Sequence, residues 1–132
     1  MELLQTQLLH AWRMHESKTR ALIDSVKQAG LESTLSTRGG RTVGQQLVHM
    51  NDIRLRMLDN MRKDLREGLP ALERAQGHDL KLLRQAFAAS GKAIEKLIET
   101  TPDGKVKDFK GGLTTFIAYL IAHESHHRGG IV

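Results

Sequence analysis

The spacing of the apolar residues, which recur at intervals of three and four along most of the sequence, is the feature that most constrains the fold. Such spacing is typical of amphipathic α-helices, whereas a half-buried strand would alternate apolar and polar residues. Leu, Ala and Met also far outnumber Val and Ile, and the first group favours helix. The sequence therefore predicts an all-helical protein.

Turn-forming and capping residues divide this periodicity into four amphipathic segments. Gly30 is predicted to end the first, and Thr42 with Gln45 has the spacing of a capping box that begins the second. The segments are expected over about residues 2–29, from Thr42 to the Gly68-Leu69-Pro70 turn, from an N-cap at Asp79 to about Thr101, and after Gly111-Gly112, with residues 33–41 as a loop. Together they predict an all-α four-helix bundle, formed by a single domain over residues 1–132.

The same periodicity predicts which side chains face the core. In the first segment they are Leu4, Leu8, Trp12, His15, Thr19, Leu22 and Val26, and in the second Val43, Leu47, Met50, Met57, Leu58, Met61 and Leu65. The third contributes Leu80, Leu83, Phe87, Ile94 and Leu97, and the fourth Leu113, Phe116, Ile117, Leu120 and Ile121. The methionines are expected to pack in the core rather than bind a metal, because they share the spacing of the other apolar residues.

The charge of the chain does not favour a macromolecular partner. A formal net charge of +5 arises from basic residues that are interspersed with acidic ones, as in residues 62–67, so nucleic acid is not an expected partner. No apolar run approaches the roughly 20 residues that cross a bilayer, and the N-terminus does not resemble a secretory signal. Cysteine is absent, which excludes disulfides and a thiol nucleophile on the protein. We expect a cytoplasmic protein.

The densest group of chemically active side chains is the C-terminal stretch His123-Glu124-Ser125-His126-His127-Arg128-Gly129. His123 and His127 are four residues apart, so on a helix they lie one turn from each other and can offer two imidazole nitrogens to one metal ion. Both are expected on the side of the helix that faces the core, whereas His126 points away. This spacing predicts part of a metal site.

A catalytic metal site needs a third protein ligand. His10 is expected on the outer side of the first helix and His78 in a loop. His15 shares the apolar stripe of the first helix, so it is either a core residue or a ligand, and His49 lies at the margin of the stripe of the second helix. From the spacing of the residues alone, the choice between His15 and His49 stays open.

Two stretches of the sequence resemble the DinB family of helical metal-binding proteins. They are Arg41-Thr42-Val43-Gly44-Gln45-Gln46-Leu47-Val48-His49-Met50 and the HxxxHRG arrangement of residues 123–129. The resemblance covers essentially the whole chain and implies that His49, His123 and His127 form a three-histidine site. The expected cofactor is a divalent metal ion, Zn or Ni before Fe or Mn.

The resemblance also suggests an activity. Characterised members of the family include transferases and isomerases that use low-molecular-weight thiols, and metal-dependent hydrolase is the commoner label, so both activities are expected alternatives. A small-molecule substrate, a thiol cosubstrate and a homodimer belong to this expectation. Members usually have Gln-Ile after the Arg-Gly, where this chain has Gly130-Ile131. They also continue further, so the sequence could lack a C-terminal part beyond Val132.

Glu124 and Arg128 each have two interpretations. Glu124 could act as a catalytic base or orient a ligand imidazole. The favoured interpretation is an ion pair with Arg54, because a buried carboxylate usually has a partner. Arg128 could attract an anionic substrate or simply complement the helix dipole.

Two other classes of protein compete with the expected metalloenzyme. Residues 123–127 match the HExxH motif, in which the glutamate activates water in metalloproteases, but no strand pattern is present to hold a peptide substrate. The second alternative is a non-catalytic, metal-stabilised helical protein that acts in binding or dimerisation during a stress or DNA-damage response. A three-histidine site argues against it, since structural zinc sites typically have four protein ligands.

Overall fold

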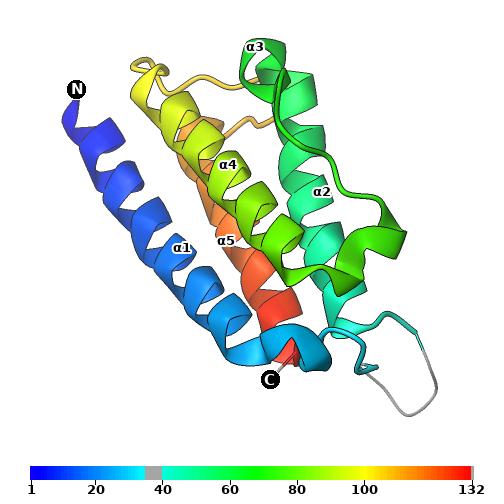
Figure 1. Cartoon of the computed structure of the whole chain (residues 1–132). Coiled ribbons are helices and arrows are strands. Elements are labelled where there is room, and N and C mark those ends of the chain that lie inside the picture. The colour runs from blue at the N-terminus through cyan, green and yellow to red at the C-terminus, as the bar shows by residue number, and fades with distance from the viewer. Residues whose placement is uncertain (35–39, 132) are drawn as a thin grey trace.

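A computed structural model describes residues 1–34 and 40–131, and in this part of the chain all regular structure is helical apart from isolated bridges. The elements are α1 (Leu3–Gly30), α2 (Val43–Met61), α3 (Lys63–Arg66), the 3₁₀ helix η1 (Arg74–His78), α4 (Leu80–Glu99) and α5 (Gly112–Ile131). Figure 1 shows the four long helices side by side. The prediction of an all-helical protein is confirmed. None of the described helices combines the length and apolarity that a membrane span requires.

The predicted helix starts are present. The Thr42 hydroxyl accepts a hydrogen bond from the backbone amide of Gln45 at 3.1 Å, and the Gln45 side chain accepts one from the Thr42 amide at 3.0 Å, which confirms the capping box. The Asp79 carboxylate caps α4 by accepting from the Leu82 amide at 3.1 Å. The predicted loop over residues 33–41 includes residues 35–39, which lie outside the described residues.

The second helix ends earlier than predicted. The expectation of a helix that continues to Gly68 is wrong, because Arg62 leaves the helical conformation with φ −148° and ψ 81° and separates α2 from the short α3. The Arg62 guanidinium donates to Asp64 at 2.9 Å and to Thr100 at 2.9 Å. Its partner Thr100 is 38 residues away, so the apolar spacing, which continues to Leu65, gives no sign of the break.

The buried face of α1 is rotated from the predicted one. Leu4 is 40 % exposed rather than buried, whereas Leu9 and Ile23 are almost completely buried. The buried residues of α1 are Gln5, Leu9, Trp12, His15, Thr19 and Ile23. Gln5 turns inward because its side-chain amide donates to the carbonyls of Ile98 and Glu99, at 3.1 and 2.9 Å, at the end of α4. A polar residue thus satisfies helix-terminal carbonyls that would otherwise lack donors.

A layer of buried polar side chains separates two apolar clusters of the core. One cluster includes Leu9, Trp12, Leu58, Ile94, Leu97, Leu113, Phe116 and Leu120, and the other includes Ile23, Leu31, Leu47, Met50, Leu83 and Phe87. Each long helix contributes to the layer, with His15 from α1, Arg54 from α2, Ser90 from α4 and Glu124 from α5. The layer ties all four long helices together next to the candidate site.

The N-terminal end of α2 packs against η1 at a contact that only glycine allows. A Cβ atom added to Gly44 would lie 1.8 Å from the carbonyl oxygen of Gly77. This close approach fixes the position of α2, which carries one of the candidate ligands.

Gly44→Ala is therefore expected to lower the free energy of unfolding by about 1–3 kcal/mol, because the new methyl group overlaps a backbone atom that cannot turn aside. The matched control is Gly129→Ala on α5, where a Cβ would meet no atom within 4 Å. This control is expected to be neutral or to stabilise by about 0.5–1 kcal/mol. Urea unfolding followed by circular dichroism gives both values, and equal effects would contradict the steric argument.

Candidate metal centre

Three histidines from two helices converge beside the polar layer. His49 comes from α2, and His123 and His127 come from successive turns of α5. One ring nitrogen of each lies within 4.8 Å of those of the other two. The ring centroids of His123 and His127 are 4.5 Å apart, and that of His49 is 4.9 Å from that of His127. The structure thus brings together the three residues that the family resemblance implies.

The prediction that His123 and His127 face the core is wrong. His123 and His127 are half-buried and turn toward α2, because the inward position of this turn belongs to Glu124, whose side chain is 0 % exposed. His126 is exposed, as expected. The cluster therefore lies at the edge of the helix packing rather than in the core.

The three imidazoles are neutral at physiological pH. Partial burial lowers the pKa of His49, and the positive charge of Arg41 adds to this shift. Burial also lowers the pKa of His123. It lowers the pKa of His127 to about 4, with further contributions from His123 and His49. A neutral imidazole keeps a nitrogen lone pair, which is the form that binds a metal ion.

The chemistry of this donor set fits a divalent transition metal. The Nε2 atoms of His123 and His127 are 3.1 Å apart, about the separation of two ligand atoms that each lie roughly 2.1 Å from one cation. Imidazole nitrogen suits zinc, nickel and iron, and no cysteine or carboxylate joins the three histidines among the described residues. Three protein ligands leave coordination positions for water or a substrate.

Two further residues border the histidines, and the sequence analysis did not identify either role. The side-chain amide of Gln46, on α2, contacts His127 Nδ1, and its oxygen accepts from Arg41 Nη1 at 3.2 Å. Tyr119 stacks on His123, with ring centroids 5.8 Å apart and planes inclined by 20°. The spacing alone could have indicated both, since Gln46 lies three residues before His49 and Tyr119 four residues before His123.

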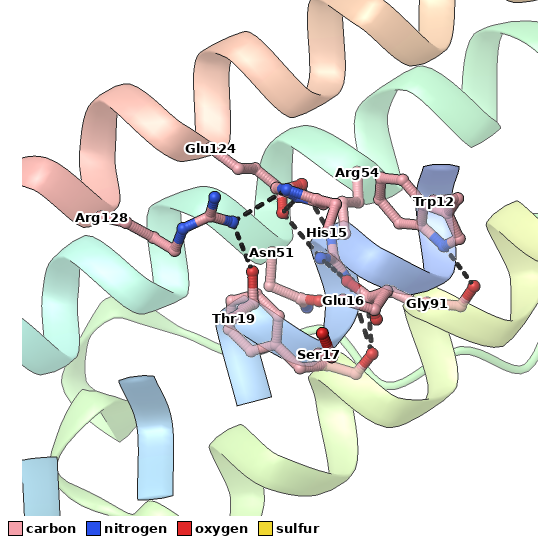
Figure 2. Close-up of polar contacts among 12 residues, drawn as sticks. Trp12, His15, Glu16, Ser17, Thr19, Asn51, Arg54, Gly91, Glu124 and Arg128 are labelled. Atoms are coloured by element: carbon pink, nitrogen blue, oxygen red, sulfur yellow. Dashed lines mark hydrogen bonds and ion pairs between the residues drawn. The ribbon is translucent and has the colours of Figure 1, made fainter. Parts of the chain in front are cut away.

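Glu124 forms the expected ion pair with Arg54. Arg54 Nε donates to one carboxylate oxygen and Nη2 to the other, each at 2.7 Å, and both side chains are completely buried (Figure 2). Burial alone would raise the pKa of Glu124, but the charge and hydrogen bonds of Arg54, with the hydrogen bond of His15, lower it to about 2. Arg54 also binds Glu16, whose carboxylate occupies space that a Cβ atom on Gly91 would fill.

His15 and Arg128 belong to the same buried network. His15 Nε2 lies 2.9 Å from Glu124, and His15 Nδ1 lies 2.9 Å from Arg128 Nη1 (Figure 2). Because Arg128 can only donate, His15 Nδ1 accepts from it, and the proton on Nε2 is donated to Glu124. Arg128 also donates to Thr19 and Ser125, each at 2.9 Å. His15 is thus a core residue, and Arg128 connects α5 to α1.

The residues at the end of α5 therefore face two different groups of side chains. His123 and His127 turn toward His49, while the residues that follow them, Glu124 and Arg128, turn toward His15. Both oxygens of Glu124 accept hydrogen bonds from Arg54. This arrangement does not support the metalloprotease alternative, in which the glutamate of HExxH activates water beside the metal.

A groove with a volume of about 610 Å³ lies elsewhere, between α1 and α4. None of the three histidines lines it. Its rim carries two ion pairs, Arg13–Glu95 at 2.5 Å and Arg84–Asp24 at 3.1 Å. Because these charges satisfy one another, the groove offers less convergent chemistry than the histidine cluster, and we place the candidate site at the histidines.

The fold and the site together define a helical protein in which two helices present three neutral histidines at the edge of their packing. The sequence profile of the DinB family matches residues 1–132, and the chain belongs to this family. No match to a curated protein or to a solved structure was found.

Proposed function

We propose that this chain is a metal-dependent enzyme of the DinB family in which His49, His123 and His127 hold one divalent cation. The single observation that carries the proposal is the convergence of three imidazoles, with ligand atoms within 4.8 Å of one another, at the edge of the packing. Zinc or nickel is the first choice, with iron or manganese as alternatives. We also propose that the four long helices form the bundle typical of the family.

The chemistry proposed for the site is activation of water or of a small thiol. A divalent cation held by neutral ligands supplies Lewis acidity for such activation. The chain has no cysteine, so a thiol would have to come from a low-molecular-weight cosubstrate. The substrate would be a small molecule, and the reaction either a hydrolysis or a thiol transfer.

The residues of the chain itself supply positioning. The buried pair of Arg54 and Glu124 holds α2 and α5 together directly beside the histidines that these two helices carry. Arg128 ties the last turns of α5 to α1. This bracing keeps the imidazoles in place for a ligand, and a site held on helices is more rigid than one on loops.

A second copy of the chain is the proposed assembly partner.

Metal analysis of protein purified without an affinity tag tests the proposal. The parent is expected to bind about one metal ion per chain, and His49→Ala to lose most of it, because two histidines hold a metal weakly. The matched control is His10→Ala, an exposed histidine of α1 that is expected to keep the full metal content. Equal metal content in the parent and His49→Ala would refute the site.

The reaction class needs a second assay on metal-loaded protein. Electrophilic substrates and hydrolysable esters or amides would be offered with and without small thiols. Turnover that requires the thiol would identify a transferase, and turnover without it a hydrolase. In either case, His49→Ala is expected to be inactive and His10→Ala to retain activity.

A further inference from the structure

We propose that Gln46 is a positioning residue that sets the tautomer of His127, and that metal binding requires its side-chain amide to rotate and release Arg41. The inference rests on the proposed function, since it concerns the same three histidines. It starts from an unbroken chain of side-chain contacts that runs from Arg41 through Gln46 and His127 to His123.

Arg41 determines the direction of every hydrogen bond in this chain of contacts, because a guanidinium group can only donate. Its Nη1 lies 3.2 Å from Gln46 Oε1, which therefore accepts. The amide nitrogen of Gln46 then faces His127 Nδ1, and since an amide nitrogen also only donates, Nδ1 must accept. The proton of the neutral His127 ring is therefore on Nε2.

The chain of contacts continues to His123, which has the opposite tautomer to His127. The Nε2 atoms of His127 and His123 are 3.1 Å apart, and one proton lies between them. Because His127 carries that proton, His123 Nε2 accepts and the proton of His123 is on Nδ1, which is buried without a partner among the described residues. His123 already has the tautomer that offers Nε2 to a metal ion, whereas His127 does not.

His127 must change tautomer to offer its Nε2 lone pair to a cation. Its proton then sits on Nδ1 and needs an acceptor, but the group that faces Nδ1 is the NH₂ of Gln46. Gln46 is only 6 % exposed, so water does not easily take over this role. Rotation of the amide by half a turn brings Oε1 to His127, so that the proton on Nδ1 gains an acceptor.

The same rotation creates a conflict with Arg41. The NH₂ group of Gln46 now faces the guanidinium, and two donors cannot share a hydrogen bond. Arg41 is exposed and can withdraw into solvent, whereas Gln46 is held in the packing of α2. The contact between Arg41 and Gln46 therefore stabilises the metal-free form and opposes metal binding.

Two substitutions of Gln46 separate this mechanism from a general structural role. The carboxylate of Gln46→Glu accepts from Arg41 and from His127 Nδ1 at the same time, so it removes the conflict. Gln46→Leu fills similar space but accepts from neither. If Gln46→Leu does not fold, Gln46→Glu still tests the proposal. It is expected to keep or raise the metal affinity, whereas disruption of the structure would lower the affinity.

Nitrogen-15 NMR of the imidazole rings measures the tautomer directly. In the metal-free parent at neutral pH, the His127 proton is expected on Nε2, and it is expected to move to Nδ1 when Zn²⁺ is added. In metal-free Gln46→Glu, the proton is expected on Nδ1 already. A His127 proton on Nδ1 in the metal-free parent would overturn the proposal.

Titration with Co²⁺, followed by its visible absorption, measures the effect on affinity. Gln46→Leu is expected to bind about 10- to 100-fold more weakly than the parent, and Gln46→Glu at least as tightly. Arg41→Ala is expected to bind about two- to tenfold more tightly, and this gain should vanish in the Gln46→Leu background. An equal gain in both backgrounds would show that Arg41 acts through its charge alone. It would contradict the proposal that metal binding requires Gln46 to release Arg41.

The failure of this inference is distinct from the failure of the proposed function. If the parent does not bind Co²⁺, or binds it as well after His49→Ala, the metal site itself is refuted. If the parent binds Co²⁺ through His49 but Gln46→Leu binds it equally well, the role of Gln46 alone is refuted.

Discussion

Replacement of Arg54 by methionine is expected to lower the free energy of unfolding by about 3–5 kcal/mol. Arg54 is completely buried, and its guanidinium donates to both oxygens of Glu124 and to Glu16. Methionine fills much of the same volume but leaves Glu124 as an unpaired charge in the core. The cost arises mainly from this stranded carboxylate, which has no access to water.

Urea unfolding of the parent and two further variants tests the explanation. Arg56→Met is the matched control, since Arg56 lies on the same helix but is 70 % exposed in its pair with Asp52, and it is expected to cost at most about 1 kcal/mol. Adding Glu124→Gln to Arg54→Met is expected to recover part of the loss, because the stranded charge disappears. If Arg54→Met cost no more than Arg56→Met, the buried pair would not stabilise the fold as argued.

The helices could be predicted because their signals are local. Apolar residues at intervals of three and four mark the buried side of a helix, and the hydroxyl of Thr42 and the carboxylate of Asp79 cap the backbone a few residues further on. The buried pair of Arg54 and Glu124 was also predictable, since each lies near the centre of an apolar stripe and each needs a partner of opposite charge.

The parts of the fold that could not be predicted depend on contacts between distant residues. Gln5 is buried because it satisfies carbonyls more than 90 residues away, which rotates α1 and leaves Leu4 exposed. Arg62 interrupts the second helix while its guanidinium reaches Thr100, which caps the C-terminal end of α4. No periodicity within a single helix carries information about such partners.

The candidate site shows the same division. The spacing of His123 and His127 is local and indicates a shared ligand, but His49 lies at the margin of its own stripe, and only the family resemblance selected it over His15. The structure distinguishes the two candidates for the third ligand, since His15 contacts Glu124 and Arg128 in the core instead of the other histidines. The contact between Gln46 and His127 links residues 81 positions apart, and the only local sign of it is that Gln46 lies three residues before His49.

Acidification of the metal-free protein is expected to remove about 3 kcal/mol of stability through Glu124 alone. Burial opposes its charge, but Arg54 and His15 outweigh this effect and lower the folded-state pKa from the ordinary 4.5 to about 2. A lowered carboxyl pKa stabilises the folded state above pH 4.5, where the group is ionised in both states. The stabilisation is lost as the pH falls from 4.5 toward 2, because the unfolded chain binds the proton first.

Urea unfolding in the presence of a chelator, repeated between pH 7 and pH 2, measures this loss. Glu124→Gln is expected to be less stable than the parent at neutral pH, because it removes the charge that Arg54 needs, and the two proteins should converge in stability as the pH approaches 2. Asp52→Asn is the control, since Asp52 pairs with Arg56 on the surface and its loss should leave the acid dependence of the parent intact. A constant difference between the parent and Glu124→Gln across this range would mean that Glu124 is not held as a buried anion, and the bracing of α2 and α5 beside the histidines would need another source.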